Sequence, residues 1–115
     1  MTKVLNETRP WGDWRIIEET DHYKIKAITI KPGQRLSLQL HKHRREHWVV
    51  VSGTALVTKD KKELRLHASE HVEIPPNTPH RIANDGKESL VIIEIQYGLC
   101  DENDIIRIED DYGRA

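Results

Sequence analysis

The sequence predicts an all-β fold, a sandwich or small barrel of antiparallel strands. Two observations predict it. Turn signals recur at short intervals, among them Pro32-Gly33, Ser52-Gly53 and Asn84-Asp85-Gly86, and short runs rich in Ile, Val and Leu lie between them. The acidic tail, residues 101–115, fits either a helical turn or an edge strand. We expect strands at Tyr23–Ile30, Leu36–His41, His47–Val51, Thr54–Lys59, His71–Ile74, His80–Ala83 and Leu90–Tyr97.

Length and charge limit the classes of protein to be considered. The chain has 115 residues, enough for a single domain spanning 1–115. A net charge of −1 gives no general attraction to nucleic acid or to anionic membranes, and no apolar run approaches the roughly 20 residues of a membrane span. The N-terminus lacks the apolar segment of a signal peptide, and one cysteine, Cys100, cannot form an internal disulfide. We therefore expect a cytoplasmic protein with an inert thiol, and neither nucleic acid nor membrane as a partner.

The most informative stretch is residues 36–48, LSLQLHKHRREHW. Successive side chains of a strand point to opposite faces, so its leucines share one face while Gln39 and His41 share the other. That polar face then either meets solvent or lines a cavity. In the following strand Glu46 and His47 point to opposite faces, so these two side chains cannot both belong to one site.

The spacing of this stretch resembles the first motif of the cupin superfamily. That motif is a Gly, five residues, His-x-His, three or four residues, Glu, six residues and Gly. The positions Gly33, Gln39, His41, Glu46 and Gly53 match it, with Gln39 in place of the first histidine. The resemblance implies the cupin double-stranded β-helix, an antiparallel jelly-roll barrel.

A second stretch resembles the second cupin motif, a Gly, five residues, Pro-x-Gly, two residues, His, three residues and Asn. The residues Pro75, His80 and Asn84 match it, and Ser69 and Asn77 stand where the motif has glycines. Asparagine tolerates the left-handed conformation that such a glycine adopts, so the change at Asn77 is mild.

Longer stretches resemble the isomerase half of type II phosphomannose isomerases. They are RPWGDW, IKPGQRLSLQLHKHRREHWVVVSGTA, IPPNTPHRIAN, IEIQYG and ENDIIRIEDDYGR. The resemblance implies a metal-dependent aldose–ketose isomerase, which interconverts mannose 6-phosphate and fructose 6-phosphate through a cis-enediol. Those enzymes usually carry a larger N-terminal domain that makes GDP-mannose. No Gly-rich phosphate loop is present here, so nucleotidyl transfer is not expected.

The same resemblance implies one divalent metal ion, and imidazole and carboxylate ligands favour zinc, with cobalt, manganese, nickel and iron as alternatives. His43 follows the first motif in a turn, where it either contacts a ligand or is exposed. His47 faces away from the glutamate, so it is expected to pack on the sheet. The expected metal ligands are Gln39, His41, Glu46 and His80.

Four further residues are candidates for substrate binding and catalysis. Arg44 precedes Glu46 by two positions, so both enter the cavity if the strand already runs there, and its guanidinium then binds phosphate or stabilises an enediolate oxygen. Glu94 interrupts an apolar run and is the candidate proton-transfer base, unless it lies on the exposed face of an edge strand. Gln96 shares its face and is a candidate for substrate binding. Lys26 either enters the same interior to bind the phosphate or lies at an edge with its amine in solvent.

Two other classes of cupin remain open, a noncatalytic protein that binds sugar phosphates and an iron-dependent dioxygenase. The dioxygenase usually needs a histidine where Gln39 stands. The expected partner is a small sugar phosphate, together with a second copy of the chain. A homodimer is expected because a short chain with RPWGDW and apolar strand faces has more apolar surface than one small sandwich can cover. Trp11 and Trp14 are the candidate contacts.

Overall fold

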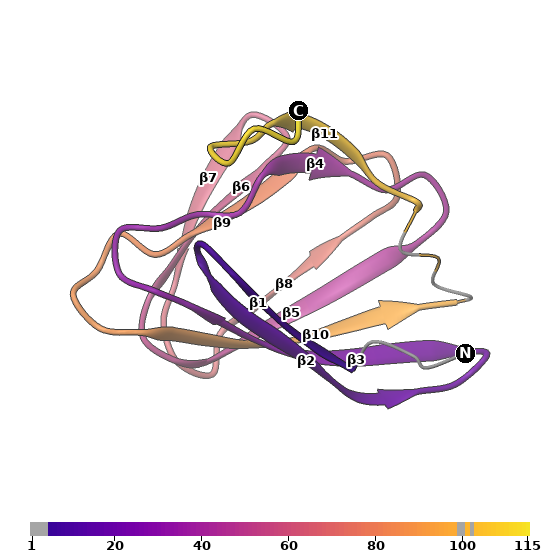
Figure 1. Cartoon of the computed structure of the whole chain (residues 1–115), viewed down its shortest axis with the longest axis horizontal. Coiled ribbons are helices and arrows are strands. Elements are labelled where there is room, and N and C mark those ends of the chain that lie inside the picture. The colour runs from indigo at the N-terminus through magenta and orange to yellow at the C-terminus, as the bar shows by residue number, and fades with distance from the viewer. Residues whose placement is uncertain (1–4, 99–100, 102) are drawn as a thin grey trace.

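Two antiparallel β-sheets face each other in the computed structural model of the chain, which describes residues 5–98, 101 and 103–115 (Figure 1). The thiol of Cys100, expected to be inert, lies outside the described residues. No helix long and apolar enough to cross a membrane is formed by the described residues. The arrangement is the cupin double-stranded β-helix predicted from the sequence.

The strands follow one another with short connections. In chain order they are β1 (Asn6–Arg9), β2 (Gly12–Glu19), β3 (Tyr23–Ile30), β4 (Leu38–Leu40), β5 (Arg45–Ser52), β6 (Ala55–Lys59), β7 (Lys62–Leu66), β8 (His71–Ile74), β9 (His80–Ala83), β10 (Leu90–Tyr97) and β11 (Ile106–Glu109). The larger sheet has the order β1-β2-β3-β10-β5-β8, and the smaller has the order β11-β4-β9-β6-β7.

Most predicted strands are confirmed, and four of them, β3, β8, β9 and β10, have the predicted bounds. The expected strand Leu36–His41 is shorter, because only Leu38–Leu40 pairs as β4. The tail forms an edge strand, β11, which pairs with β4. The strands β1, β2 and β7 were not predicted, since their charged residues obscure the alternation of apolar and polar side chains.

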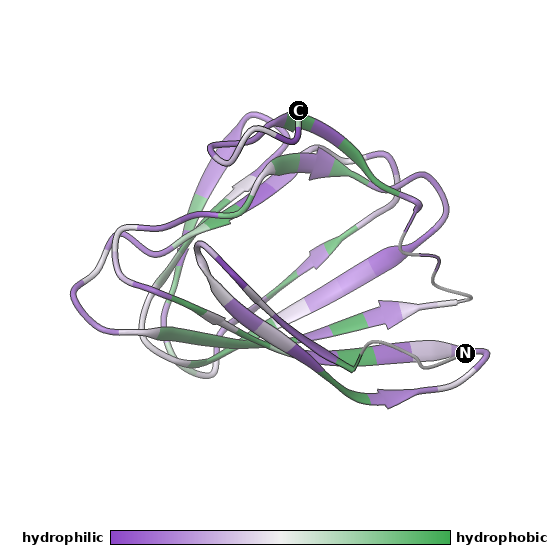
Figure 2. Ribbon diagram, viewed as in Figure 1, coloured by the Kyte–Doolittle hydropathy of each residue, from purple (hydrophilic) through white to green (hydrophobic). Residues whose placement is uncertain are grey.

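The interior is divided into an apolar part and a polar part by the pairing of β3 with β10. In this antiparallel register Lys24 lies opposite Gln96 and Lys26 lies opposite Glu94, and all four are buried at the same end of the two strands. The inward positions at the other end are isoleucines and a leucine of the hydrophobic core. Figure 2 shows hydrophobic and hydrophilic residues interspersed along the strands.

The β1–β2 hairpin packs tightly on β3 and brings tryptophans to the interior. Gly12 is required there, because a Cβ atom would lie 1.9 Å from the carbonyl oxygen of Thr29. Trp11 is 4% exposed and belongs to the core, so the expectation that it forms a homodimer contact is wrong. Trp14 is half-buried and packs against that core. The homodimer itself stays a prediction.

The two motif positions that usually hold glycine both adopt the left-handed backbone conformation. The φ angle is 72° at Ser69 and 61° at Asn77. The backbone N–H of Asn77 also donates a hydrogen bond of 2.7 Å to the carbonyl oxygen of His41. The turn before β9 is thereby fastened to the end of β4, which helps to hold the two histidines of the motifs in place.

Candidate metal centre

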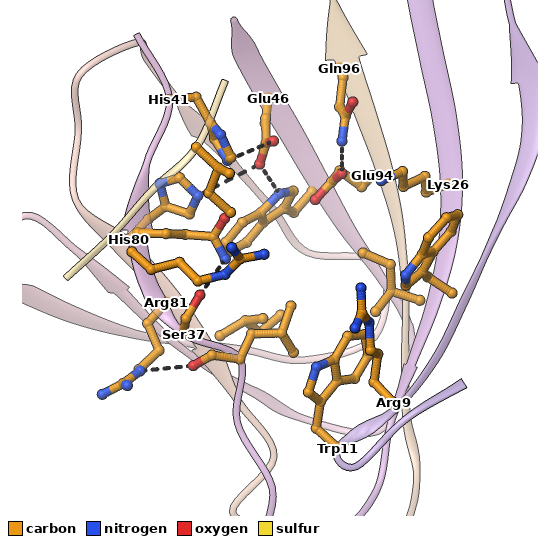
Figure 3. A pocket seen from close by; sticks show the side chains of 18 of the residues that line it. Arg9, Trp11, Lys26, Ser37, His41, Glu46, His80, Arg81, Glu94 and Gln96 are labelled. Carbon is orange, nitrogen blue, oxygen red and sulfur yellow. Dashed lines mark hydrogen bonds and ion pairs between the residues drawn. The ribbon is translucent and has the colours of Figure 1, made fainter. Parts of the chain in front are cut away.

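Three side chains from three elements converge inside the structure. His41 follows β4, Glu46 lies in β5 and His80 begins β9. Nε2 of His41 lies 3.3 Å from Oε2 of Glu46, and Nε2 of His80 lies 3.8 Å from Oε1 of the same carboxylate. One ligand atom from each residue lies within 4.8 Å of the other two, and all three residues are buried (Figure 3). One cation can therefore contact all three.

The second nitrogen of each imidazole is held by the backbone. Nδ1 of His41 lies 2.6 Å from the carbonyl oxygen of Asp104, and Nδ1 of His80 lies 2.8 Å from that of Thr78. A carbonyl oxygen only accepts, so both Nδ1 atoms carry the proton and both Nε2 atoms present a lone pair to the centre. This arrangement of an oriented imidazole is typical of metal-binding histidines.

The electrostatic environment keeps His41 in the neutral form that a metal requires. The pKa of His41 is lowered to about 4, mainly by burial, and the positive charge of Arg44 contributes to this lowering. At neutral pH no proton then competes with a cation for Nε2. The donor set, its burial and its protonation therefore all fit a divalent metal ion.

Gln39 lies on the same wall of the interior, as its alternation with His41 predicts. Its backbone pairs directly with His80 across β4 and β9, and its side chain lines the same pocket. The amide nitrogen Nε2 donates a 3.0 Å hydrogen bond to the hydroxyl of Ser37. The amide oxygen is thus the atom of Gln39 suited to a cation, and its role as the fourth ligand stays a prediction.

Arg44 points into the interior although β5 begins one residue later. Its Nε donates to Oε2 of Glu46 at 2.7 Å, and one terminal nitrogen lies 3.2 Å from Nε2 of His41. The neighbouring cations Lys42 and Arg45 are exposed. The structure therefore separates one inward arginine from the solvent-facing rest of the basic run, as the sequence predicted.

The two remaining histidines of this region lie away from the centre. His43 is exposed, and its backbone N–H donates to the carboxylate of Asp104 at 2.9 Å. His47 lies on the opposite face of β5, where its ring stacks on that of His71 with 4.9 Å between the ring centroids. Neither histidine contributes to the cluster of His41, Glu46 and His80.

Glu94 lies beside the centre on β10, which is an inner strand and not an edge strand of its sheet. Its carboxylate is buried and accepts a hydrogen bond from the amide nitrogen of Gln96. Burial raises the pKa of Glu94, and the nearby negative charge of Glu46 acts in the same direction. The positive charges of Lys26 and Arg44 oppose this rise. A carboxyl group whose pKa is raised in this way is suited to proton transfer.

Lys26 and Gln96 line the same pocket. Nζ of Lys26 lies 4.4 Å from the centroid of the Trp14 ring, and the lysine is buried, so it does not extend into solvent. Gln96 is fully buried, and within the described residues its Oε1 atom has no hydrogen-bond partner. The six labelled side chains of this inner end can be followed in Figure 3, where they are His41, Glu46, His80, Glu94, Gln96 and Lys26.

The pocket that contains these residues has a volume of about 440 Å³, within the usual range for small-molecule sites. Sequence reasoning missed several cations that line it. Arg9 lies in an unpredicted strand, and Lys24 carried no motif. Arg114 ends the family-like stretch ENDIIRIEDDYGR but was given no role. Arg107 was left unassigned, although its place between Ile106 and Ile108 is a signal for a strand with one polar face.

Comparison with known proteins assigns the chain to a family. Residues 2–110 match the family described as "Mannose-6-phosphate isomerase C-terminal". The alginate biosynthesis protein AlgA of Pseudomonas aeruginosa is 51% identical over 108 residues, which are 93% of this chain and 22% of that protein. A mannose-1-phosphate guanylyltransferase of Escherichia coli is 47% identical over 108 residues, 93% of this chain and 23% of that protein. The chain thus spans between a fifth and a quarter of these curated relatives.

Solved structures give the same fold. A putative sugar phosphate isomerase from Acidithiobacillus ferrooxidans is 31% identical with a TM-score of 0.63, over 68% of this chain and 51% of that one. The capsular polysaccharide assembling protein CapF from Staphylococcus aureus has a TM-score of 0.78 at 23% identity, over 95% of this chain and 33% of that one. At that identity CapF supports the fold alone.

Proposed function

Because the chain belongs to the family of mannose-6-phosphate isomerase C-terminal domains, we propose that it interconverts mannose 6-phosphate and fructose 6-phosphate. The observation that carries this proposal is the convergence of His41, Glu46 and His80 beside the buried Glu94. An aldose–ketose isomerisation needs two elements, a positive centre for the carbonyl oxygen and a base for the adjacent carbon. These four residues supply both in one pocket.

In this proposal His41, Glu46 and His80 hold the divalent ion, and the amide oxygen of Gln39 completes the set. Imidazole and carboxylate ligands suit zinc, while the amide oxygen also suits harder ions such as manganese. When bound, the ion would polarise the carbonyl group of the open-chain sugar and stabilise negative charge on its oxygen.

The proton transfers fall to residues of the chain itself. Glu94 takes the proton from C2 of the open-chain aldose and returns it to C1, while a second proton moves from O2 to O1. The product is the ketose with its carbonyl group at C2, so atoms and charge balance. Burial raises the pKa of Glu94, which makes its carboxylate a stronger proton acceptor.

Arg44 and Lys26 supply positive charge at the inner end of the pocket. The Arg44 guanidinium already contacts Glu46 and His41, so it lies where charge would develop on the sugar oxygens. Lys26 faces Glu94 across β3 and β10, and its charge favours the ionised form of that base.

The experiment that tests the proposal measures fructose 6-phosphate formed from mannose 6-phosphate by metal-depleted protein, with one divalent metal added back at a time. We expect turnover with at least one metal and none with the His80→Ala variant. Binding of mannose 6-phosphate without turnover under every metal would make the noncatalytic sugar-phosphate-binding protein the better assignment. Oxygen consumption with iron, and no fructose 6-phosphate, would favour the dioxygenase.

A further inference from the structure

Positive charge is concentrated in the pocket. The chain as a whole has a net charge of −1, yet among its described residues seven cationic ones line the pocket beside three carboxylates. Such a surplus in a partly enclosed site attracts an anion. The cationic residues are Arg9, Lys24, Lys26, Arg44, Arg81, Arg107 and Arg114.

The inner cations are already placed around the candidate reaction centre. Arg44 contacts Glu46 and His41, and Lys26 lies opposite Glu94. In a hexose 6-phosphate the phosphate group is attached at the far end of the carbon chain from C1 and C2. If the reacting carbons lie beside Glu94, the phosphate therefore has to lie at a different part of the pocket, away from these two cations.

Arg107 is placed to reach that other part. In the smaller sheet its backbone pairs with Gln39, whose backbone pairs in turn with His80. These three residues form one row across β11, β4 and β9, with Arg107 at the edge of the sheet. Ile106 and Ile108 on either side are exposed, while Arg107 lines the pocket.

The side chain of Arg107 is half-buried, and no described carboxylate forms an ion pair with it. Within the described residues it makes no hydrogen bond or ion pair, and its Nε atom is buried without a partner. Removing a guanidinium nitrogen from water without a hydrogen bond costs free energy. A ligand that accepts this hydrogen bond would recover that cost.

Two more arginines approach Arg107 from separate elements. Arg9 comes from β1 and Arg114 from the C-terminal turn, and both line the pocket. Burial is the main cause that lowers the pKa of Arg107, and the charges of Arg114 and Arg9 act in the same direction. Figure 3 shows Arg9 across the pocket from His41 and His80.

Among the described residues, carboxylates form ion pairs with Arg9 and Arg114 but not with Arg107. Arg9 pairs with Glu7 at 2.9 Å, and Arg114 pairs with Asp110 at 2.8 Å. The charge of Asp110 also attracts Arg107 without contacting it in an ion pair. Three guanidinium groups with two carboxylates leave a positive surplus at this end, centred on Arg107.

We propose that Arg107, together with Arg9 and Arg114, binds the phosphate group of the sugar phosphate. This inference rests on the proposed function, and it specifies how the pocket orients its substrate. Guanidinium groups bind phosphate through paired N–H donors, which fix direction as well as position. With the phosphate held here, C1 and C2 of the open chain extend toward Glu94 and the metal ligands.

The test uses an unreactive open-chain analogue, sorbitol 6-phosphate, with sorbitol and inorganic phosphate as companion probes in calorimetric titrations. We expect the wild type to bind sorbitol 6-phosphate, and free phosphate to compete with it. The Arg107→Met variant should lose roughly 10- to 100-fold in affinity for sorbitol 6-phosphate, the loss expected from a charge-assisted hydrogen bond. Its affinity for sorbitol should not change.

The matched control is Arg65→Met, because Arg65 is an exposed arginine on β7 that pairs with Asp85 outside the pocket. It should bind as the wild type does. Lys26→Met tests the alternative that the phosphate binds at the inner end of the pocket, since this variant removes a cation there. Wild-type affinity in Arg107→Met combined with loss in Lys26→Met would place the phosphate at the inner end and overturn the proposal. No binding of sorbitol 6-phosphate by the wild type would overturn it as well.

Thermal unfolding of each variant checks that the fold survives, and Arg9→Met repeats the test if Arg107→Met does not fold. Turnover separates this proposal from the proposed function. If the wild type isomerises mannose 6-phosphate while Arg107→Met keeps full affinity, only the phosphate site is wrong. If binding depends on Arg107 but no metal supports turnover, only the isomerase assignment is wrong.

Discussion

Nε of Arg44 lies 2.7 Å from Oε2 of Glu46, so one guanidinium directly contacts the carboxylate that is also the candidate metal ligand. The two residues are separated by a single exposed arginine, Arg45, whose side chain pairs with Glu73 on the outer face. The chain therefore presents two adjacent arginines to opposite sides of the same sheet. Of these two arginines, Arg44 alone faces the pocket.

The first prediction concerns Arg44→Lys. Lysine keeps the charge but loses the planar fork that contacts Glu46 and His41, so turnover should fall by roughly 10- to 1000-fold, as expected when one charge-stabilising donor is lost. Metal content should be retained, because Arg44 is not a ligand. Steady-state kinetics and metal analysis measure the two effects.

The controls for Arg44 are Lys42→Ala and Arg45→Ala, since both side chains are exposed in the same basic stretch. Each should reduce turnover much less than Arg44→Lys. An equal reduction in all three variants would mean that the stretch acts as a diffuse electrostatic patch, which contradicts a specific role for the inward guanidinium.

The second prediction concerns the metal ligands. His41→Ala and His80→Ala should each abolish stoichiometric metal binding, because each removes one of three converging donors. His43→Ala should retain the metal, since His43 is exposed and only its backbone is bonded. Metal analysis of purified variants after dialysis is the measurement. Loss of metal in the His43 variant alone would contradict the assigned donor set.

The third prediction concerns the stability of metal-depleted protein between pH 6.5 and about pH 4. The folded-state pKa of His41 is lowered to about 4, so over this window the unfolded state binds more protons than the folded state. Stability is therefore gained as pH rises through the window and lost as pH falls.

In His41→Gln this part of the pH dependence should disappear. Urea unfolding at a series of pH values measures it, with the exposed His67→Gln as the matched control. An unchanged slope in His41→Gln would show that His41 is not the group responsible.

The fourth prediction separates activity from stability at Glu94. Its folded-state pKa is raised, so ionising it costs stability, and that cost is fully present above the folded-state pKa. In metal-depleted protein near neutral pH, Glu94→Gln should therefore unfold at an equal or higher urea concentration than the wild type.

The same variant should lose at least about 100-fold in turnover with metal present, because the base is gone. Glu63→Gln, at an exposed position of β7, should change neither quantity. Full activity of Glu94→Gln would require another base.

Much of this arrangement could be predicted from the sequence, because strand alternation is a local property. The bounds of Tyr23–Ile30 and Leu90–Tyr97 can be recognised because these strands are strongly apolar. The alternation of side chains along a strand placed Gln39 on the same face as His41, and Arg44 on the same face as Glu46. Spacing matched to the cupin motifs then brought His80 to the same centre, although it lies more than thirty residues further along the chain.

The outer end of the pocket could not be predicted in the same way. Arg9 lies in NETR, a four-residue strand that pairs with the adjacent β2, and Arg107 lies in IRIE, a four-residue strand that pairs with the distant β4. Whether such short segments form strands depends on the partner strand that receives their hydrogen bonds, and no local pattern identifies that partner. The interior position of Trp11 was missed for the same reason, since it depends on how the β1–β2 hairpin packs on β3.

The most direct test of the central claim is a proton NMR spectrum of mannose 6-phosphate incubated in D₂O with metal-loaded protein. A carboxylate that moves the C2 proton to C1 can exchange that proton with solvent during each turnover. We expect fructose 6-phosphate to appear and to carry deuterium at C1, and we expect Glu94→Gln and His80→Ala each to abolish both its formation and the exchange. Unchanged mannose 6-phosphate with every divalent metal, in protein shown to be folded and metal-bound, would contradict it.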